Sequence, residues 1–96
     1  MRKINNFKSI NIGDTIIFKD KNISAKWVVK FNSIDDDGRI IGMGYYFGSS
    51  KFNEGNRINE INIDSEWFEK LLNTWEVFKP KKSYTYWSIK IAEMLL

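Results

Sequence analysis

The sequence predicts an α+β fold, in which a curled antiparallel sheet of about five strands, small and barrel-like, is packed by one amphipathic helix. Short segments rich in β-branched and aromatic residues recur between glycine and aspartate turn signals, which is typical of such a sheet. One later segment instead has apolar residues at helical spacing. With 96 residues, 43% of them apolar, the chain can build one modest core, so we expect a single domain over residues 1–96.

The first two strands are expected on either side of a turn at Asp20-Lys21-Asn22. Gly13-Asp14 is an earlier turn signal, and the β-branched run behind it predicts a strand over residues 15–19. A second strand is expected over residues 25–33, because apolar and basic side chains alternate there and indicate a half-buried strand. Its two faces would carry Trp27, Val29 and Phe31 and, opposite them, Lys26, Val28 and Lys30.

The next hairpin is predicted by Asp35-Asp36-Asp37-Gly38, since glycine accepts the positive φ that a tight turn requires. A returning strand follows over residues 39–47. Residues 57–63 predict a short strand with a bulge, because its isoleucines do not keep one phase. The aspartates do not fit a calcium loop, since Gly44 occupies the twelfth position, where the loop needs a bidentate glutamate.

A helix is predicted from Asp64, whose carboxylate can accept hydrogen bonds from the first-turn N–H groups. Its apolar face is expected to carry Trp67, Phe68, Leu71, Leu72 and Trp75. Residues 83–96 fit either a strand or a helix by periodicity, and their β-rich composition favours a strand through Ile91.

The composition excludes several classes of function. The chain has no cysteine and no histidine, which removes thiolate chemistry, zinc sites and Ser–His–Asp triads. No pair of carboxylates stands out by its spacing, so we expect no enzyme, no catalytic residue, no metal and no cofactor. Neither a signal peptide nor a membrane span is indicated, so a cytoplasmic protein is expected. The abundance of Ile, Lys, Asn, Phe and Tyr, which have AT-rich codons, suggests a low-GC genome or one of its phages.

Aromatic residues make up 16% of the chain, more than a small core needs, so some are expected at a protein interface. We place that interface beside the polar, glycine-bounded loop over residues 48–56. Its predicted residues are Tyr45, Tyr46, Lys51, Phe52 and Arg57. In and directly after the preceding strand, Gly42, Gly44 and Gly48 would leave a bare stripe of backbone, which either the helix or a ligand must fill.

The charge is uneven along the chain: residues 1–30 carry a net +5, residues 31–78 a net −5 and residues 79–96 a net +3. Basic residues interleaved with aromatic ones could bind a single-stranded nucleic acid, with charge for the phosphates and rings for base stacking. The predicted residues are Lys26, Lys30, Arg39, Lys79, Lys81, Lys82, Tyr84 and Tyr86.

The sequence thus predicts a small non-enzymatic protein that binds a host protein or protein complex stoichiometrically. Its size and codon bias suit an inhibitor of a host defence complex, made by a phage or mobile element. The alternative is a small β module that binds single-stranded nucleic acid or a nucleotide.

Overall fold

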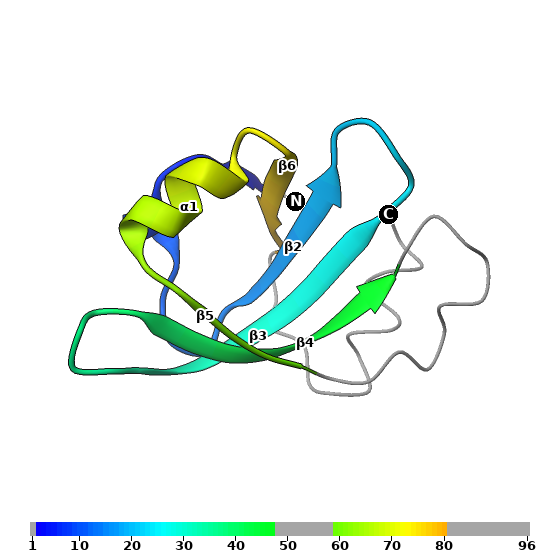
Figure 1. Ribbon diagram of the computed structural model, residues 1–96. Helices are drawn as coiled ribbons and strands as arrows, with labels where there is room; N and C mark the ends of the chain where they lie inside the picture. The colour runs from blue at the N-terminus through cyan, green and yellow to red at the C-terminus, as the bar shows by residue number, and fades with distance from the viewer. Residues whose placement is uncertain (1, 48–58, 81–96) are drawn as a thin grey trace.

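The structure is a computed structural model that describes residues 2–47 and 59–80. These residues form an antiparallel sheet of six strands in the order β1-β6-β2-β3-β4-β5, with one short 3-10 helix and one α-helix (Figure 1). The elements in chain order are β1 (Arg2–Ile4), η1 (Phe7–Ser9), β2 (Thr15–Asp20), β3 (Lys26–Ile34), β4 (Ile40–Phe47), β5 (Asn59–Ile63), α1 (Ser65–Leu71) and β6 (Trp75–Lys79).

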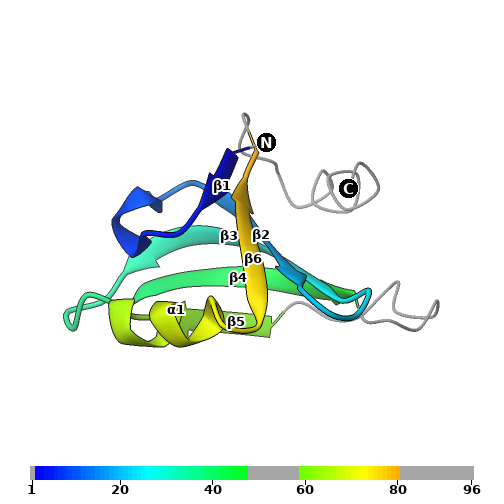
Figure 2. The ribbon, with the colours of Figure 1, turned by 90° about the horizontal axis from the view of Figure 1, so that it is seen from above.

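The sheet curls but does not close into a barrel, since β1 and β5 form its two edges. The predicted α+β class and curled antiparallel sheet are therefore confirmed. The predicted barrel-like form is not, because the sheet stays open. Helix α1 connects the edge strand β5 to β6, which lies next to the other edge (Figures 1 and 2). The helix thus spans the open side of the curl and covers its concave face.

Strands β2, β3 and β4 follow the predicted ranges to within a residue or two. Of the segment over residues 57–63, where the sequence predicts a bulge, the structure describes residues 59–63, and these contain no bulge. The pairing of β4 with β5 runs without a break from Ile40 opposite Ile63 to Gly44 opposite Asn59. The irregularity lies instead in β3, between Phe31 and Ser33 opposite β4. An extra residue there bends the strand and increases the curl of the sheet.

The predicted helix is shorter than its apolar periodicity suggested. Asp64 is the N-cap, as predicted, and its carboxylate accepts a hydrogen bond from the Trp67 N–H at 2.7 Å. The helix ends at Leu71, however, and Trp75 begins β6, where it pairs with Asp20 of β2. Pairing with a distant strand decides the conformation of this residue, although its spacing alone fits a helix.

The core lies on the concave face of the sheet. Ile16 of β2, Val29 and Phe31 of β3 and Val77 of β6 are completely buried there. Phe68 of α1 closes the end of this core, and its ring lies 5.8 Å from that of Phe7 in η1. In the part of the chain that the structure describes, no helix has the length and apolar character needed to cross a membrane.

The convex face carries a second row of buried side chains. Ile17, Val28 and Tyr45 are neighbours in the pairing of β2, β3 and β4, and each is at most 6% exposed. The prediction of a half-buried strand over residues 25–33 is therefore wrong at Val28, which is completely buried on the second face. A central strand that is buried on both faces carries apolar residues at consecutive positions. Its sequence therefore lacks the strict apolar–polar alternation of a half-buried strand.

Candidate binding pocket

A pocket of about 180 Å³ opens on the concave side of the sheet, between the sheet and α1. Half of its eight lining side chains are aromatic: Phe18, Trp27, Trp67 and Trp75. The other half are aliphatic: Val29, Ile61, Ile63 and Leu71. Trp67 is 51% exposed, so the pocket reaches solvent beside the helix. The lining therefore offers apolar and aromatic surface to a ligand.

Strand pairing positions the aromatic wall of the pocket. Phe18 of β2 lies opposite Trp27 of β3, and residues opposite each other in an antiparallel pair share a face. Trp75 lies opposite Asp20, two residues further along β2 on the same face. The ring of Tyr46 lies 5.0 Å from that of Trp27, centroid to centroid, and supports it from β4.

Helix α1 and the glycines of β4 complete the pocket. Trp67 and Leu71 are four residues apart in α1 and therefore lie on one side of the helix. Gly44 belongs to β4. A Cβ added at this position would meet Val29 Cγ2 at 2.8 Å and Ile61 Cδ1 at 3.2 Å. Two side chains of the pocket wall thus occupy the space above this glycine. The stripe expected along β4 is therefore filled by internal packing at its two described glycines, by β3 and β5 atoms at Gly44 and by the β3 backbone at Gly42.

The size of the pocket limits what it can hold. An apolar cavity of about 150 Å³ accommodates one benzene ring, whereas sites for drug-sized ligands and cofactors measure roughly 300–1,000 Å³. The present volume of about 180 Å³ fits one side chain or one small head group. A whole nucleotide would leave most of its atoms outside.

The residues predicted for a protein interface do not share one surface in the described structure. Tyr45 and Tyr46 are consecutive in β4 and so point to opposite faces of the sheet. Tyr45 is buried on the convex side, whereas Tyr46 stacks on Trp27 on the concave side. Lys51, Phe52 and Arg57 lie outside the described residues, so the interface itself stays a prediction.

Four of the residues predicted for nucleic-acid binding are described by the structure, and these four do not lie together. Lys26 and Lys30 lie on the convex face of β3. Lys79 is largely buried, with its ammonium 2.8 Å from Asp14 Oδ2 and donating to the Ser9 carbonyl at 3.2 Å. The predicted residues beyond these, Lys81, Lys82, Tyr84 and Tyr86, lie outside the described residues. The described members thus form no continuous basic track.

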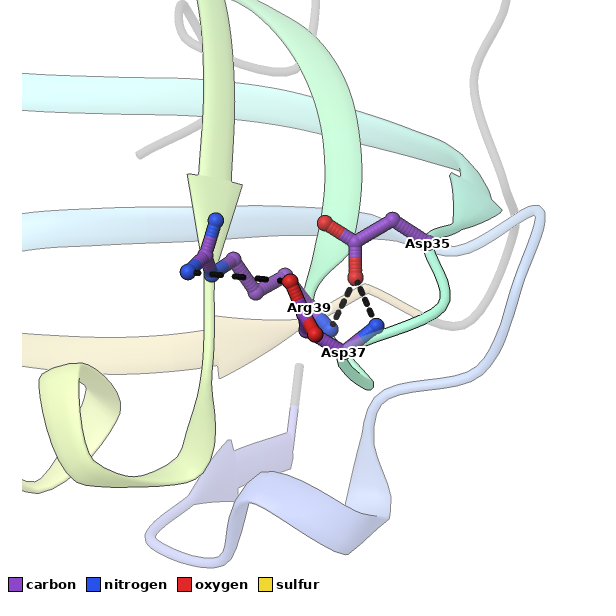
Figure 3. A network of polar contacts seen from close by, with 3 residues as sticks. All are labelled: Asp35, Asp37 and Arg39. Atoms are coloured by element: carbon purple, nitrogen blue, oxygen red, sulfur yellow. Dashed lines mark hydrogen bonds and ion pairs between the residues drawn. The ribbon is translucent and has the colours of Figure 1, made fainter.

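The acidic turn after β3 holds the remaining predicted residue, Arg39 (Figure 3). Asp35 Oδ1 accepts hydrogen bonds from the N–H groups of Asp37 and Arg39, both at 2.9 Å. Gly38 has φ +82°, as the predicted turn requires, and the Arg39 guanidinium lies 3.9 Å from the Asp37 carboxylate. These carboxylates therefore stabilise the turn. Across residues 2–47 and 59–80 no three potential metal-ligating side chains gather at one point.

One carboxyl group on the convex face has a perturbed pKa. Glu76 accepts a hydrogen bond from the Lys3 ammonium at 3.0 Å, which together with the charge of Lys3 holds the Glu76 pKa below its usual 4.5. Desolvation opposes this shift, and the charges of Lys19 and Lys21 make smaller contributions that lower the pKa further. This pair connects β1 to β6 and lies away from the pocket, so it supports the sheet edge rather than the site.

The sequence analysis identified most of the pocket residues as core or helix face, but not the pocket itself. Its lining comes from β2, β3, β5, α1 and β6, and runs from Phe18 to Trp75. No local pattern joins residues so far apart. The sequence feature that pointed toward such a pocket was the excess of aromatic residues, which includes four tryptophans.

Comparisons with known proteins give this chain no relative. No model of a protein family matches it, and neither the search of curated proteins nor that of solved structures found a significant match. The pocket and the fold around it are accordingly the basis for any functional assignment.

Proposed function

We propose that this chain is a non-enzymatic binding protein that docks onto a partner protein and takes one of its side chains into the concave pocket. The observation that carries this proposal is an open pocket of about 180 Å³, lined by three tryptophans and a phenylalanine. Protein interfaces concentrate their binding energy in a few large anchors that fill such desolvated pockets.

The rim of the pocket supports the same interpretation. Trp67 keeps 51% of its surface exposed although it borders a well-packed core. Exposed tryptophan next to an apolar pocket provides contact area around an anchor and excludes water from it. The expectation that the partner is a host defence complex rests on size and composition alone and stays a prediction.

The test compares three immobilised baits in host lysate: the wild type, Leu71→Trp and Met43→Trp. Leu71 lines the pocket, so the larger indole fills it, whereas Met43 lies on the convex face and is 40% exposed. We expect the wild type and Met43→Trp to capture the same protein, and Leu71→Trp to lose at least nine-tenths of it, roughly tenfold. Urea unfolding of each bait confirms that it is folded. Capture that Leu71→Trp leaves unchanged would refute the proposal.

The nucleic-acid alternative concerns the other face of the sheet. Lys19 and Lys26 lie directly opposite each other in the pairing of β2 with β3, on the convex face. A nuclease arm of the same capture experiment separates the two functions. Proteins that vanish after nuclease treatment, together with an affinity for single-stranded DNA that falls steeply between about 50 and 200 mM salt, would favour nucleic-acid binding.

A further inference from the structure

The aromatic share of the pocket favours a particular kind of occupant. The ring faces of Trp27, Trp67 and Trp75 carry negative charge density, which attracts cations within about 6 Å of a ring centroid. The Lys70 ammonium already lies 6.0 Å from the Trp67 ring centroid on the surface of α1. Four aliphatic side chains complete the lining, so an occupant must also present apolar surface.

Asp20 lies on the same face of the sheet as the pocket, at the end of β2, although its side chain is not part of the lining. Asp20 is opposite Trp75 in the pairing of β2 with β6. Its Oδ1 atom accepts hydrogen bonds from the N–H groups of Asn22 at 2.7 Å and Ile23 at 3.0 Å, which fix the orientation of the carboxyl group. The carboxylate thus supplies a fixed negative charge at the end of β2, on the side of the sheet where a positively charged occupant would lie.

The apolar, aromatic lining and the Asp20 carboxylate together favour a cation that is covered by apolar groups. An ordinary lysine ammonium is strongly hydrated and would lose its hydrogen bonds among apolar side chains. A trimethylammonium group is positively charged, has no N–H to satisfy and is covered by methyl groups. The volume of about 180 Å³ admits one such head group, and the rest of the ligand must lie outside.

We propose that the occupant of the pocket is the trimethylammonium group of a trimethylated lysine carried by the partner protein. This inference rests on the proposed function, because it assumes that the pocket receives a side chain of a partner. It adds the charge and the chemical class of that side chain.

The test uses matched probes on the intact chain. The first is the peptide acetyl-Gly-trimethyllysine-Gly-amide. The second is its neutral isostere, in which a tert-butyl carbon replaces the quaternary nitrogen, and the third is the unmodified lysine peptide. Binding is followed through the indole N–H signals of the tryptophans in two-dimensional NMR. We expect the trimethylated peptide to bind about tenfold more tightly than the isostere, since only the charge differs between them.

Two variants test the carboxylate. Asp20→Asn keeps an oxygen that can accept the two loop hydrogen bonds but removes the charge, and it should reduce the preference for the trimethylated peptide several-fold. Asp36→Asn removes the same charge from the exposed turn after β3 and should leave the preference unchanged.

Three results would overturn the inference. Binding of the neutral isostere that equals or exceeds that of the trimethylated peptide would show that the pocket takes an apolar group, while leaving protein docking intact. Indole signals that no probe moves would also overturn it, and the bait experiment would still judge docking separately. Choline that binds more tightly than the trimethylated peptide would assign the site to a free small molecule instead of a protein side chain.

Discussion

Gly42→Ala should destabilise the protein markedly, because backbone occupies the space into which the new methyl group would project. A Cβ at this position would lie against the Lys30 carbonyl, 2.9 Å from its carbon and 3.0 Å from Phe31 Cα. Both neighbours belong to β3, next to the irregularity between Phe31 and Ser33. The methyl group can be accommodated only if the two strands separate.

The magnitude follows from two opposing effects. Overpacking a well-filled interior costs about 1–3 kcal/mol, and the upper end applies where rigid backbone must move. Alanine in a strand recovers about 0.5–1 kcal/mol of chain entropy relative to glycine. We therefore expect Gly42→Ala to lower the free energy of unfolding by about 2 kcal/mol.

Gly44→Ala provides the matched comparison two residues along the same strand. Its Cβ would meet Val29 Cγ2 at 2.8 Å, the Val28 carbonyl oxygen at 3.1 Å and Ile61 Cδ1 at 3.2 Å. Two of these three neighbours are side-chain atoms, which can shift more easily than backbone. We expect a cost of about 1 kcal/mol. Shortening the obstructing side chain with Val29→Ala should show a favourable coupling energy with Gly44→Ala and none with Gly42→Ala.

Urea unfolding followed by tryptophan fluorescence measures both variants. With a slope of about 1 kcal/mol/M, the midpoint should fall by about 2 M for Gly42→Ala and about 1 M for Gly44→Ala. A Gly42→Ala midpoint equal to or above that of the wild type would refute the reasoning. So would a rescue of Gly42→Ala by Val29→Ala, since no side chain lies among the three atoms nearest to that methyl group.

Three further predictions concern contacts outside the glycine strand. Asp64→Ala removes the N-cap of α1 and should lower the free energy of unfolding by about 1 kcal/mol in urea, whereas Asp64→Ser should restore most of it. Lys79→Met breaks the partly buried contact with Asp14 and should cost about 1–3 kcal/mol in the same assay; an unchanged midpoint would contradict the structural role of this lysine. Because the pKa of Glu76 is lowered in the folded state, its contribution to stability is present above the unfolded value of 4.5 and is lost as the pH falls through the folded pKa. Midpoints measured from pH 6 to 3 should therefore fall less in Lys3→Met, which lacks the pairing cation, and equal slopes would argue against this linkage.

Local sequence signals predicted the parts of the fold that local interactions determine. The turn at Asp35–Gly38 needed a glycine with positive φ, and Gly38 has φ +82°. The N-cap at Asp64 needed an oxygen near the first-turn N–H groups, and the carboxylate lies 2.7 Å from the Trp67 nitrogen. Each depends on residues at most four apart in the chain, so the pattern and its physical cause lie in the same short segment.

The parts that the sequence analysis missed depend on distant pairings. Trp75 continues the apolar spacing of α1, yet it pairs with Asp20, some fifty residues earlier in the chain. The short strand β1 has three residues and is stabilised by pairing with β6 and by the burial of Ile4 in the core. Propensity is a weak guide for such edge segments, because the tertiary contacts decide their conformation.

The pocket was missed for the same reason. Its aromatic residues come from four elements, and each residue alone fits the interpretation of core packing or a helix face. The composition indicated more aromatic residues than a small core requires, but it could not show that Trp27, Trp67 and Trp75 surround one space. That information exists only in the curl of the sheet and in the path of α1 across it.

The proposed docking pocket and the lysines of β2 and β3 lie on opposite faces of one sheet. Phe18 and Trp27 point toward the concave pocket, whereas their neighbours Lys19 and Lys26 in the same two strands point to the convex side. The thickness of the sheet separates these sets, so a partner side chain in the pocket would not touch the lysines of β2 and β3. Binding that depends on Leu71 and binding that depends on Lys26 would therefore be independent activities, and a single partner could show both only by reaching around an edge of the sheet.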